Sequence, residues 1–166
     1  MPLLRVAGPD DVDQLTAVFL GCWRISYAQV MPASLVAGMT SQKAWSMWAD
    51  ALKRPGQTVL AATEDEPPHT VLGFVGFQHL ADGAGYVSSL YVSPNLQGGG
   101  VGRLLLSEAE KELRDSGART ARLWVFEENA ASRAFYVKRG WALDGRRETL
   151  PEWEVPQLGM TKSLVD

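Results

Sequence analysis

The sequence lacks two features that would place the protein outside the cytoplasm. It has one cysteine, Cys22, in 166 residues, so no disulfide can form within the chain, as is typical of a reducing compartment. Because Cys22 stands in the apolar run VFLGCW, we expect a buried side chain rather than a nucleophile. No segment approaches the roughly 18 consecutive apolar residues of a membrane span, and residues 1–11 lack the pattern of a signal peptide. These absences predict a cytoplasmic protein without a membrane partner.

A strong charge of either sign is also absent. The 16 Lys and Arg residues and the 19 Asp and Glu residues give a formal net charge of -3, so nothing indicates a surface that binds nucleic acid. The length of 166 residues fits one domain, 1–166, whose core needs neither disulfides nor a metal. We therefore predict no nucleic-acid partner and no metal site.

What the sequence does contain is a regular order of strand-like and helix-like segments. Short turns between adjacent apolar runs predict an antiparallel meander, and apolar residues at helical spacing predict helices around it. The order β-α-α-β-β-β-α-β-α-β-β indicates an α+β (mixed α/β) fold, with one mixed sheet of about seven strands and about four helices on its two faces. The expected strands are 3–7, 58–64, 70–80, 86–92, 121–127, 141–148 and 155–162, and the expected helices are 12–29, 41–52, 100–116 and 129–139.

The segment SLYVSPNLQGGGVGRLLL (residues 89–106) joins a strand to a helix through a cluster of glycines. A P-loop is excluded, because no glycine here precedes Lys-Ser or Lys-Thr at the required spacing. The dinucleotide pattern GxGxxG also fails, because Arg103 stands at its last position. The pattern that fits is Q-x-x-G-x-G over residues 97–102.

Glycines at the start of a helix have a physical use. The first turn leaves backbone N–H groups unpaired, and a pyrophosphate can accept them. Side chains at Gly100 and Gly102 would obstruct its approach, so we expect these two glycines to be required. Gly98 and Gly99 have no such reason to be glycine. A flexible surface turn is the alternative interpretation.

The strand, the glycine loop and the helix together resemble the signature motif of the GNAT family of N-acetyltransferases, [R/Q]-x-x-G-x-[G/A] after a strand that ends in a Tyr-Val pair. A second segment is similar to the family's N-x-x-[A/S]-x-x-F/Y-Y-x-x-x-G-F, with Asn129, Ser132, Tyr136 and Gly140 in place and Trp141 instead of Phe. The resemblance is specific over residues 86–141, and the order of elements extends it to nearly the whole chain.

The resemblance implies acetyl-CoA as donor, the primary amine of a small molecule or of a protein or peptide as acceptor, and direct attack in a ternary complex. It also implies a V-shaped gap between strands 86–92 and 121–127, in which the pantetheine arm pairs with the strand backbone. The N–H of Val92 would favour negative charge on the thioester carbonyl. The residues implied to bind the cofactor are Leu90, Tyr91, Val92, Gln97, Gly98, Gly99, Gly100, Val101, Gly102, Arg103, Asn129, Ser132 and Tyr136.

Two protons must move in this chemistry. Tyr136 stands at the family's general-acid position and would protonate the leaving thiolate, although a packing role beside Phe135 is the alternative. The base is open, because the strand YVSSLYV has no carboxylate where many relatives place a glutamate. We expect a water-mediated base. His79 is a candidate near neutral pH, and the remaining candidates are Glu127, Glu128 and Glu148.

Aromatic residues on the first two predicted helices suit an acceptor site, because an aromatic wall attracts an ammonium group. For Trp45 and Trp48 we favour core packing instead, and Arg24 is expected either to bind an acceptor carboxylate or to lie on the surface. The residues expected on the acceptor side are Trp23, Arg24, Tyr27 and His79.

Two other functions are compatible with the residues. A non-catalytic acyl-CoA-binding or sensing module would keep the glycine cradle without turnover, and the missing strand carboxylate favours it. A nucleotide-binding domain would use the same helix start for another phosphate. Relatives often dimerise, so both a monomer and a homodimer stay open.

Overall fold

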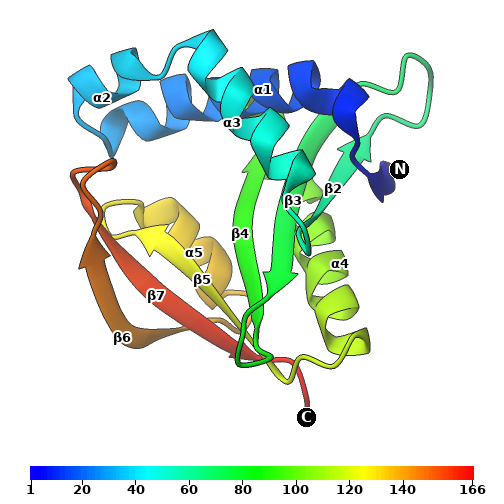
Figure 1. Cartoon of the computed structure of the whole chain (residues 1–166), viewed down its shortest axis with the longest axis vertical. Helices are drawn as coiled ribbons and strands as arrows, with labels where there is room; N and C mark the ends of the chain where they lie inside the picture. The colour runs from blue at the N-terminus through cyan, green and yellow to red at the C-terminus, as the bar shows by residue number, and fades with distance from the viewer.

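The computed structural model describes residues 1–166 and shows a seven-stranded mixed sheet in the order β1-β2-β3-β4-β5-β7-β6 (Figure 1). The strands are β1 (Leu3–Val6), β2 (Thr58–Thr63), β3 (Val71–His79), β4 (Gly85–Val92), β5 (Thr120–Phe126), β6 (Ala142–Thr149) and β7 (Pro156–Ser163). The α-helices are α1 (Val12–Gly21), α2 (Ala33–Gly38), α3 (Ser41–Lys53), α4 (Val101–Asp115) and α5 (Ala130–Val137). The predicted fold class and the mixed sheet of about seven strands are confirmed.

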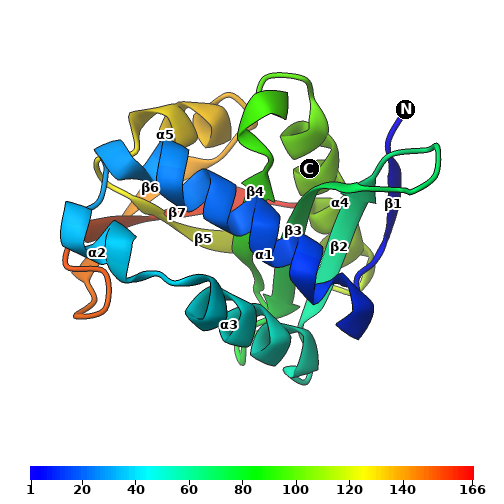
Figure 2. The same ribbon diagram turned by 90° about the horizontal axis from the view of Figure 1, so that it is seen from above.

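Strands β1 to β4 form an antiparallel half of the sheet that is covered on both faces. Alternation along β2 shows this directly, because successive side chains point to opposite faces. Val59 and Ala61 belong to the cluster with α1 and α3, whereas Leu60 and Ala62 belong to the cluster with α4. Seen from above, α3 and α4 accordingly lie on opposite sides of the sheet (Figure 2).

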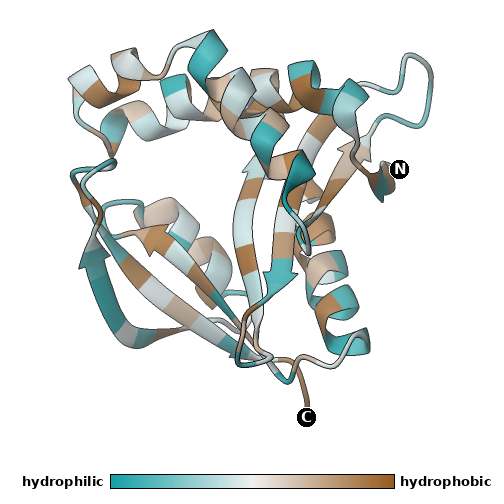
Figure 3. Ribbon diagram, viewed as in Figure 1, coloured by the Kyte–Doolittle hydropathy of each residue, from teal (hydrophilic) through white to brown (hydrophobic).

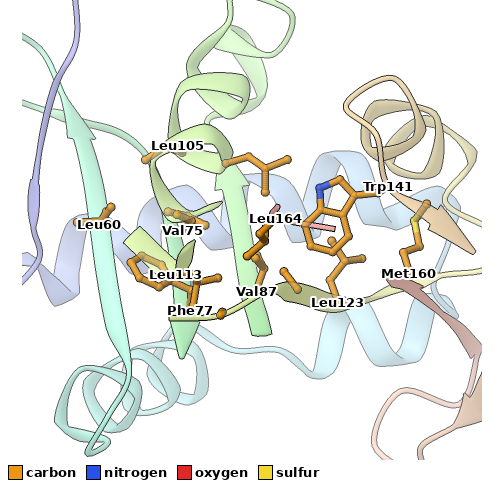
Figure 4. Packing of buried hydrophobic residues seen from close by; sticks show 14 of the residues in the cluster. Leu60, Val75, Phe77, Val87, Leu105, Leu113, Leu123, Trp141, Met160 and Leu164 are labelled. Carbon is orange, nitrogen blue, oxygen red and sulfur yellow. The ribbon is translucent and has the colours of Figure 1, made fainter. Parts of the chain in front are cut away.

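The α4 side holds a continuous core of 17 buried residues. It runs from Leu60 and Val75 past Leu105 to Trp141 and Met160, so it packs behind strands on both sides of the β4–β5 junction (Figure 4). Burial of this apolar surface is the main stabilising term, and it fixes α4 and α5 against the sheet.

Strands β5, β7 and β6 form a second antiparallel half. It joins the first half through β4 and β5, which are parallel but pair only at Gly85–Ala121 and Tyr86–Arg122. Beyond these two pairs the strands separate, which is the V-shaped gap that the resemblance to the acetyltransferase family implies. The outer strand β6 is largely hydrophilic (Figure 3) and mostly exposed.

The prediction of one α-helix over residues 12–29 is wrong. α1 ends at Gly21, and a π-helical turn (Cys22–Ser26) and a 3-10 turn (Tyr27–Gln29) follow. The side chains of Cys22 and Trp23 in this turn are both buried. The Cys22 thiol donates to the carbonyl oxygen of Val92 at 3.0 Å, which ties this turn to the end of β4.

The short helix α2 is absent from the predicted elements. It follows Pro32 directly, has six residues and buries none of them. Helical periodicity in a sequence reflects a buried face, so this helix leaves no pattern to detect. None of the helices is both long and apolar enough to cross a membrane.

Candidate active site

A cavity of about 580 Å³ lies in the gap between β4 and β5. Its walls come from β4, β5, α1, α3 and α5 and from the end of the molecule where β6 turns into β7. The separation of the two strands therefore creates a pocket that reaches through the sheet between the helical layers.

One end of the cavity is aromatic. The ring of Tyr91 on β4 lies edge-on to Phe19 on α1, with centroids 5.2 Å apart, and Tyr27 lies edge-on to Phe126 on β5 at 5.8 Å. Trp23 contacts Tyr27 with centroids 5.6 Å apart. Burial raises the pKa of Tyr27 and of Tyr91, so both phenols stay neutral. This end brings together Trp23 and Tyr27, two of the residues predicted on the acceptor side.

The other end is polar and lies over strand β3. Gly76 leaves space in which the hydroxyls of Ser88 and Ser89 sit, because a Cβ at position 76 would lie 2.9 and 2.6 Å from their oxygens. Both oxygens are buried and have no hydrogen-bond partner within the protein. Buried polar atoms of this kind call for a ligand or a water molecule. The other polar residues that line the cavity include Gln57, Gln78, Tyr86, Glu148, Glu152 and Gln157.

The backbone of β4 faces the gap at alternate residues. The N–H of Ser93 donates to the carbonyl of Leu72 at 2.9 Å, and Val92 pairs with Gly73 in the same register. Because hydrogen-bonded and non-hydrogen-bonded pairs alternate in an antiparallel ladder, the backbone groups of Leu90 and Val92 point away from β3. The N–H groups of Leu90 and Val92 and the carbonyl of Leu90 are available to a chain in the gap, whereas the Val92 carbonyl already accepts from Cys22 and Gln97.

The backbone of the glycine loop adopts a conformation that favours glycine at two positions. Gly98 has φ +89° and Gly100 has φ +92°, in the left-handed region where other residues are strained. A Cβ on Gly102 would lie 3.4 Å from the ring of Phe135, an ordinary contact distance, so packing against α5 does not require glycine here. The structure thus gives Gly98 a reason to be glycine that the sequence did not show.

The loop ends at the first turn of α4, whose N-cap is Gly100. No atom lies within 4 Å of where a Cβ would stand on Gly98 or Gly100, so the approach to this turn is open. Gln97 donates from Nε2 to the Val92 carbonyl at 3.2 Å and so joins the loop to the strand. The exposed backbone N–H groups of the turn fit an anionic group such as pyrophosphate.

Helix α5 supplies a phenol to the same cavity. Its N-cap is Asn129, whose side-chain oxygen accepts from the N–H of Ser132 at 3.1 Å. Tyr136, two turns along, lines the cavity and packs edge-on against Phe135 and Trp141. Burial raises the pKa of Tyr136, so its hydroxyl carries a proton throughout the neutral range. A protonated phenol at this place can act as an acid.

Three predicted residues lie elsewhere. Arg24 is exposed and lines a separate pocket beside α2, and Arg103 is exposed on α4. His79 bonds through Nε2 to the hydroxyl of Ser116 at 2.6 Å, in a pocket at the C-terminal end of α4. The structure does not bring these side chains to the cavity.

Two further aromatic residues, Trp45 and Trp48 on α3, differ in burial. Trp48 is buried in the core, whereas Trp45 is exposed and donates from Nε1 to Asp13 at 2.8 Å.

The buried Cys22 has a pKa raised by burial to about 11, so it is an unreactive thiol at neutral pH. Among the glutamates considered as base, Glu127 pairs with Arg147 and Glu148 lines the cavity.

Comparison with known proteins decides the family. A family model described as "Acetyltransferase (GNAT) family" matches residues 16–141. The chain belongs to the GNAT family. It is similar to a probable N-acetyltransferase of Mycobacterium tuberculosis, with 29% identity over 161 residues that cover 94% of this chain and 90% of that protein.

A second curated relative of this GNAT protein is a spermidine N(1)-acetyltransferase of Thermoplasma acidophilum, with 25% identity over 146 residues that cover 85% and 88% of the two chains. Among solved structures, the PaiA N-acetyltransferase of Thermoplasma acidophilum in complex with coenzyme A has the same fold, with a TM-score of 0.82 and 23% identity over 98% of this chain and 99% of that chain. The family and its named relatives show that the protein is an acetyltransferase enzyme, so the non-catalytic module and the nucleotide-binding domain are set aside.

Proposed function

We propose that this acetyltransferase moves the acetyl group of acetyl-CoA to a primary amine by direct attack in a ternary complex. The observation that carries the proposal is the separation of β4 from β5 beyond two residue pairs. It opens a slot that is lined by Leu90 of β4 and by Tyr136 of α5.

The residues present fit acetyl-CoA. The N–H groups at the start of α4 would bind the pyrophosphate, with Gly98 and Gly100 holding the backbone in the required conformation. Leu90 and Val92 would pair with the pantetheine as a neighbouring strand does. Asn129 and Ser132 line the far wall of the same slot. The thioester of this substrate supplies the acetyl group.

The catalytic step needs a donor for the carbonyl oxygen and an acid for the sulfur. A β4 backbone N–H, that of Val92 in our prediction, would stabilise the negative charge that develops on the carbonyl oxygen. As the amine nitrogen bonds to the acetyl carbon and the carbon–sulfur bond breaks, Tyr136 would give its proton to the departing sulfur. The amine's own proton would pass to water in the polar end of the cavity.

The acceptor is proposed to be a small-molecule amine. A relative acts on spermidine, and the cavity of about 580 Å³ is of the size that holds small ligands. The protein or peptide acceptor considered from the sequence is the second candidate. The cytoplasmic location, the single domain and the homodimer stay predictions.

The test measures CoA release with a thiol reagent, using acetyl-CoA and a panel of polyamines, amino sugars, free lysine and peptides with a free N-terminus. We expect release that depends on at least one small amine and a mass gain of one acetyl group on that amine. Tight CoA binding without acceptor-dependent release from any amine would contradict the proposal.

A further inference from the structure

Glu148 on β6 is a carboxylate that lines the cavity. It pairs across the strands with Gln157 on β7, which in turn pairs with Phe126 on β5. Residues in register across neighbouring strands lie on the same face of a sheet. This row therefore directs Glu148 toward the side of the sheet where Phe126 lines the cavity.

The position of the Glu148 carboxylate is fixed by a neutral group. The Gln157 amide donates from Nε2 to Oε1 of Glu148 at 2.7 Å, and Gln157 is itself only 7% exposed. No other group of the protein donates a hydrogen bond to Glu148, and no Lys or Arg forms an ion pair with it. The side chain is held in place, but its charge is not balanced.

Three other carboxylates of the sheet and its helices are each paired with a cation, although Glu108 and Glu112 on α4 are half-buried without one. Asp11 pairs with Arg5 at 2.7 Å, Glu110 with Lys162 at 2.9 Å, and Asp144 with Arg146 at 2.8 Å. A carboxylate taken partly out of water is costly unless a cation or several donors compensate it. Glu148 alone is half-buried in the cavity without that compensation.

The charged groups around the cavity make a cation the matching ligand. Two carboxylates, Glu148 and Glu152, and one guanidinium, Arg54, line it. Arg54 bonds to Gln57. Arg146 lies on the same strand as Glu148 and influences the pKa of Tyr86. Its guanidinium donates to the Asp144 carboxylate and stacks on the ring of Trp124. Burial is the main cause that raises the pKa of Tyr86, the charge of Arg146 opposes this shift, and the charge of Glu148 adds to it.

We propose that Glu148 binds a second, non-reacting ammonium group of the acceptor, and that this contact selects acceptors that carry such a cation over acceptors that do not. The inference rests on the proposed function and names the substrate class of its acceptor site. A primary ammonium carries three N–H donors. Glu148 would accept one through the oxygen that Gln157 leaves open, while the aromatic end of the cavity receives the apolar part of the molecule.

The test compares Glu148→Gln with the wild type on two acceptors of similar size, 1,4-diaminobutane, which is cationic at pH 7, and an arylamine, which is neutral. Gln keeps the shape and can still bond to Gln157, so folding is retained and is checked by thermal unfolding. We expect the KM for the diamine to rise about 30-fold, as for loss of a charged hydrogen bond. The KM for the arylamine and for acetyl-CoA should change less than about twofold.

Glu154→Gln is the matched control, because Glu154 is an exposed carboxylate of the turn between β6 and β7 that does not line the cavity; we expect a change in the diamine KM below about threefold. A rise in both acceptor KM values for Glu148→Gln, or a change in the diamine KM below threefold, overturns the inference while the proposed function stands. If the wild type acetylates no amine, the proposed function fails and the inference fails with it. Calorimetric titration of diamine into the CoA complex gives a second readout, which Glu148→Gln should weaken by a similar factor.

Discussion

Strands β1 to β4 are covered by helices on both faces, whereas β5, β7 and β6 are covered on one face and line the cavity with the other. In the first half, side chains on both faces of β2 are buried and apolar. In the second half, the cavity face carries Trp124, Phe126, Glu148 and Gln157. The difference indicates that the first half supplies the frame and the glycine loop, while the second half is free to carry groups that act on a ligand.

The largest expected effect is on stability and concerns the half of the molecule formed by β1 to β4 and their helices. Trp23→Ala removes a side chain that is 1% exposed and packs against Phe19, Tyr27 and Trp153. We expect the free energy of unfolding to fall by about 3–5 kcal/mol, as for other buried Trp truncations, measured by urea denaturation.

Trp124→Ala is the control, because it makes the same substitution on β5 in the other half of the sheet. Trp124 is half-buried and has Arg146 over its ring, so we expect a loss of only about 1–2 kcal/mol from the smaller apolar area it buries. Equal losses in the two variants would show that the cavity face of β5 is as much a part of the core as α1 is.

The second effect concerns chemistry rather than stability. Tyr136→Phe keeps the ring that packs between Phe135 and Trp141 and removes the hydroxyl. We expect kcat to fall about 100-fold, in the range for loss of a general acid, with CoA affinity and the unfolding midpoint nearly unchanged. Steady-state kinetics and CoA titration measure both. An unchanged kcat from pH 6 to 9 would remove Tyr136 from the mechanism.

The third effect concerns phosphate binding at Gly100, the N-cap of α4. Gly100→Asn and Gly100→Asp differ only in charge, and Asn tolerates a left-handed φ better than most residues. We expect Asn to weaken CoA binding a few-fold and Asp to weaken it about tenfold further, because the added charge opposes the pyrophosphate. Calorimetry at low and high salt measures this. Equal affinities of the two variants would argue against an anion at this turn.

The smallest effect lies where the π turn meets β4. Cys22→Ala removes the thiol that bonds to the Val92 carbonyl, but Gln97 still donates to the same oxygen. We expect a loss of about 1 kcal/mol at pH 7. Because the folded pKa of Cys22 is raised from 9.0 to about 11, the thiol's contribution is complete below pH 9 and is lost as pH rises toward 11. Urea denaturation at pH 7 and pH 10 should therefore show the gap between wild type and variant closing; a constant gap would contradict this.

The sequence was sufficient for the parts of the molecule that rest on local chemistry. Strand and helix order follow from periodicity, and the glycine loop follows from the needs of a helix start. The π turn after Gly21 was not predictable, because it depends on the close approach of Pro94 and Val92, which lie about seventy residues away in the chain.

Part of the candidate site depends on register, which local sequence does not encode. Glu148 and Gln157 stand nine residues apart, and their contact follows from the pairing of β6 with β7 across the turn between them. Glu148 therefore appeared in the sequence as one of several glutamates. His79 and Arg24 had the right chemistry for a site, but the ends of β3 and the π turn direct them to other surfaces.

The junction of β4 and β5 has a mechanical consequence. With two residue pairs it is the shortest hydrogen-bonded seam in the sheet, so it can serve as a hinge between the halves. A chain that pairs along β4 would extend the seam and couple the halves, and any ligand that binds only the folded state also raises its stability. We therefore expect amide hydrogen exchange at Leu90 and Val92 to slow when CoA binds, by more than it slows within β2, where neighbouring strands already protect both edges.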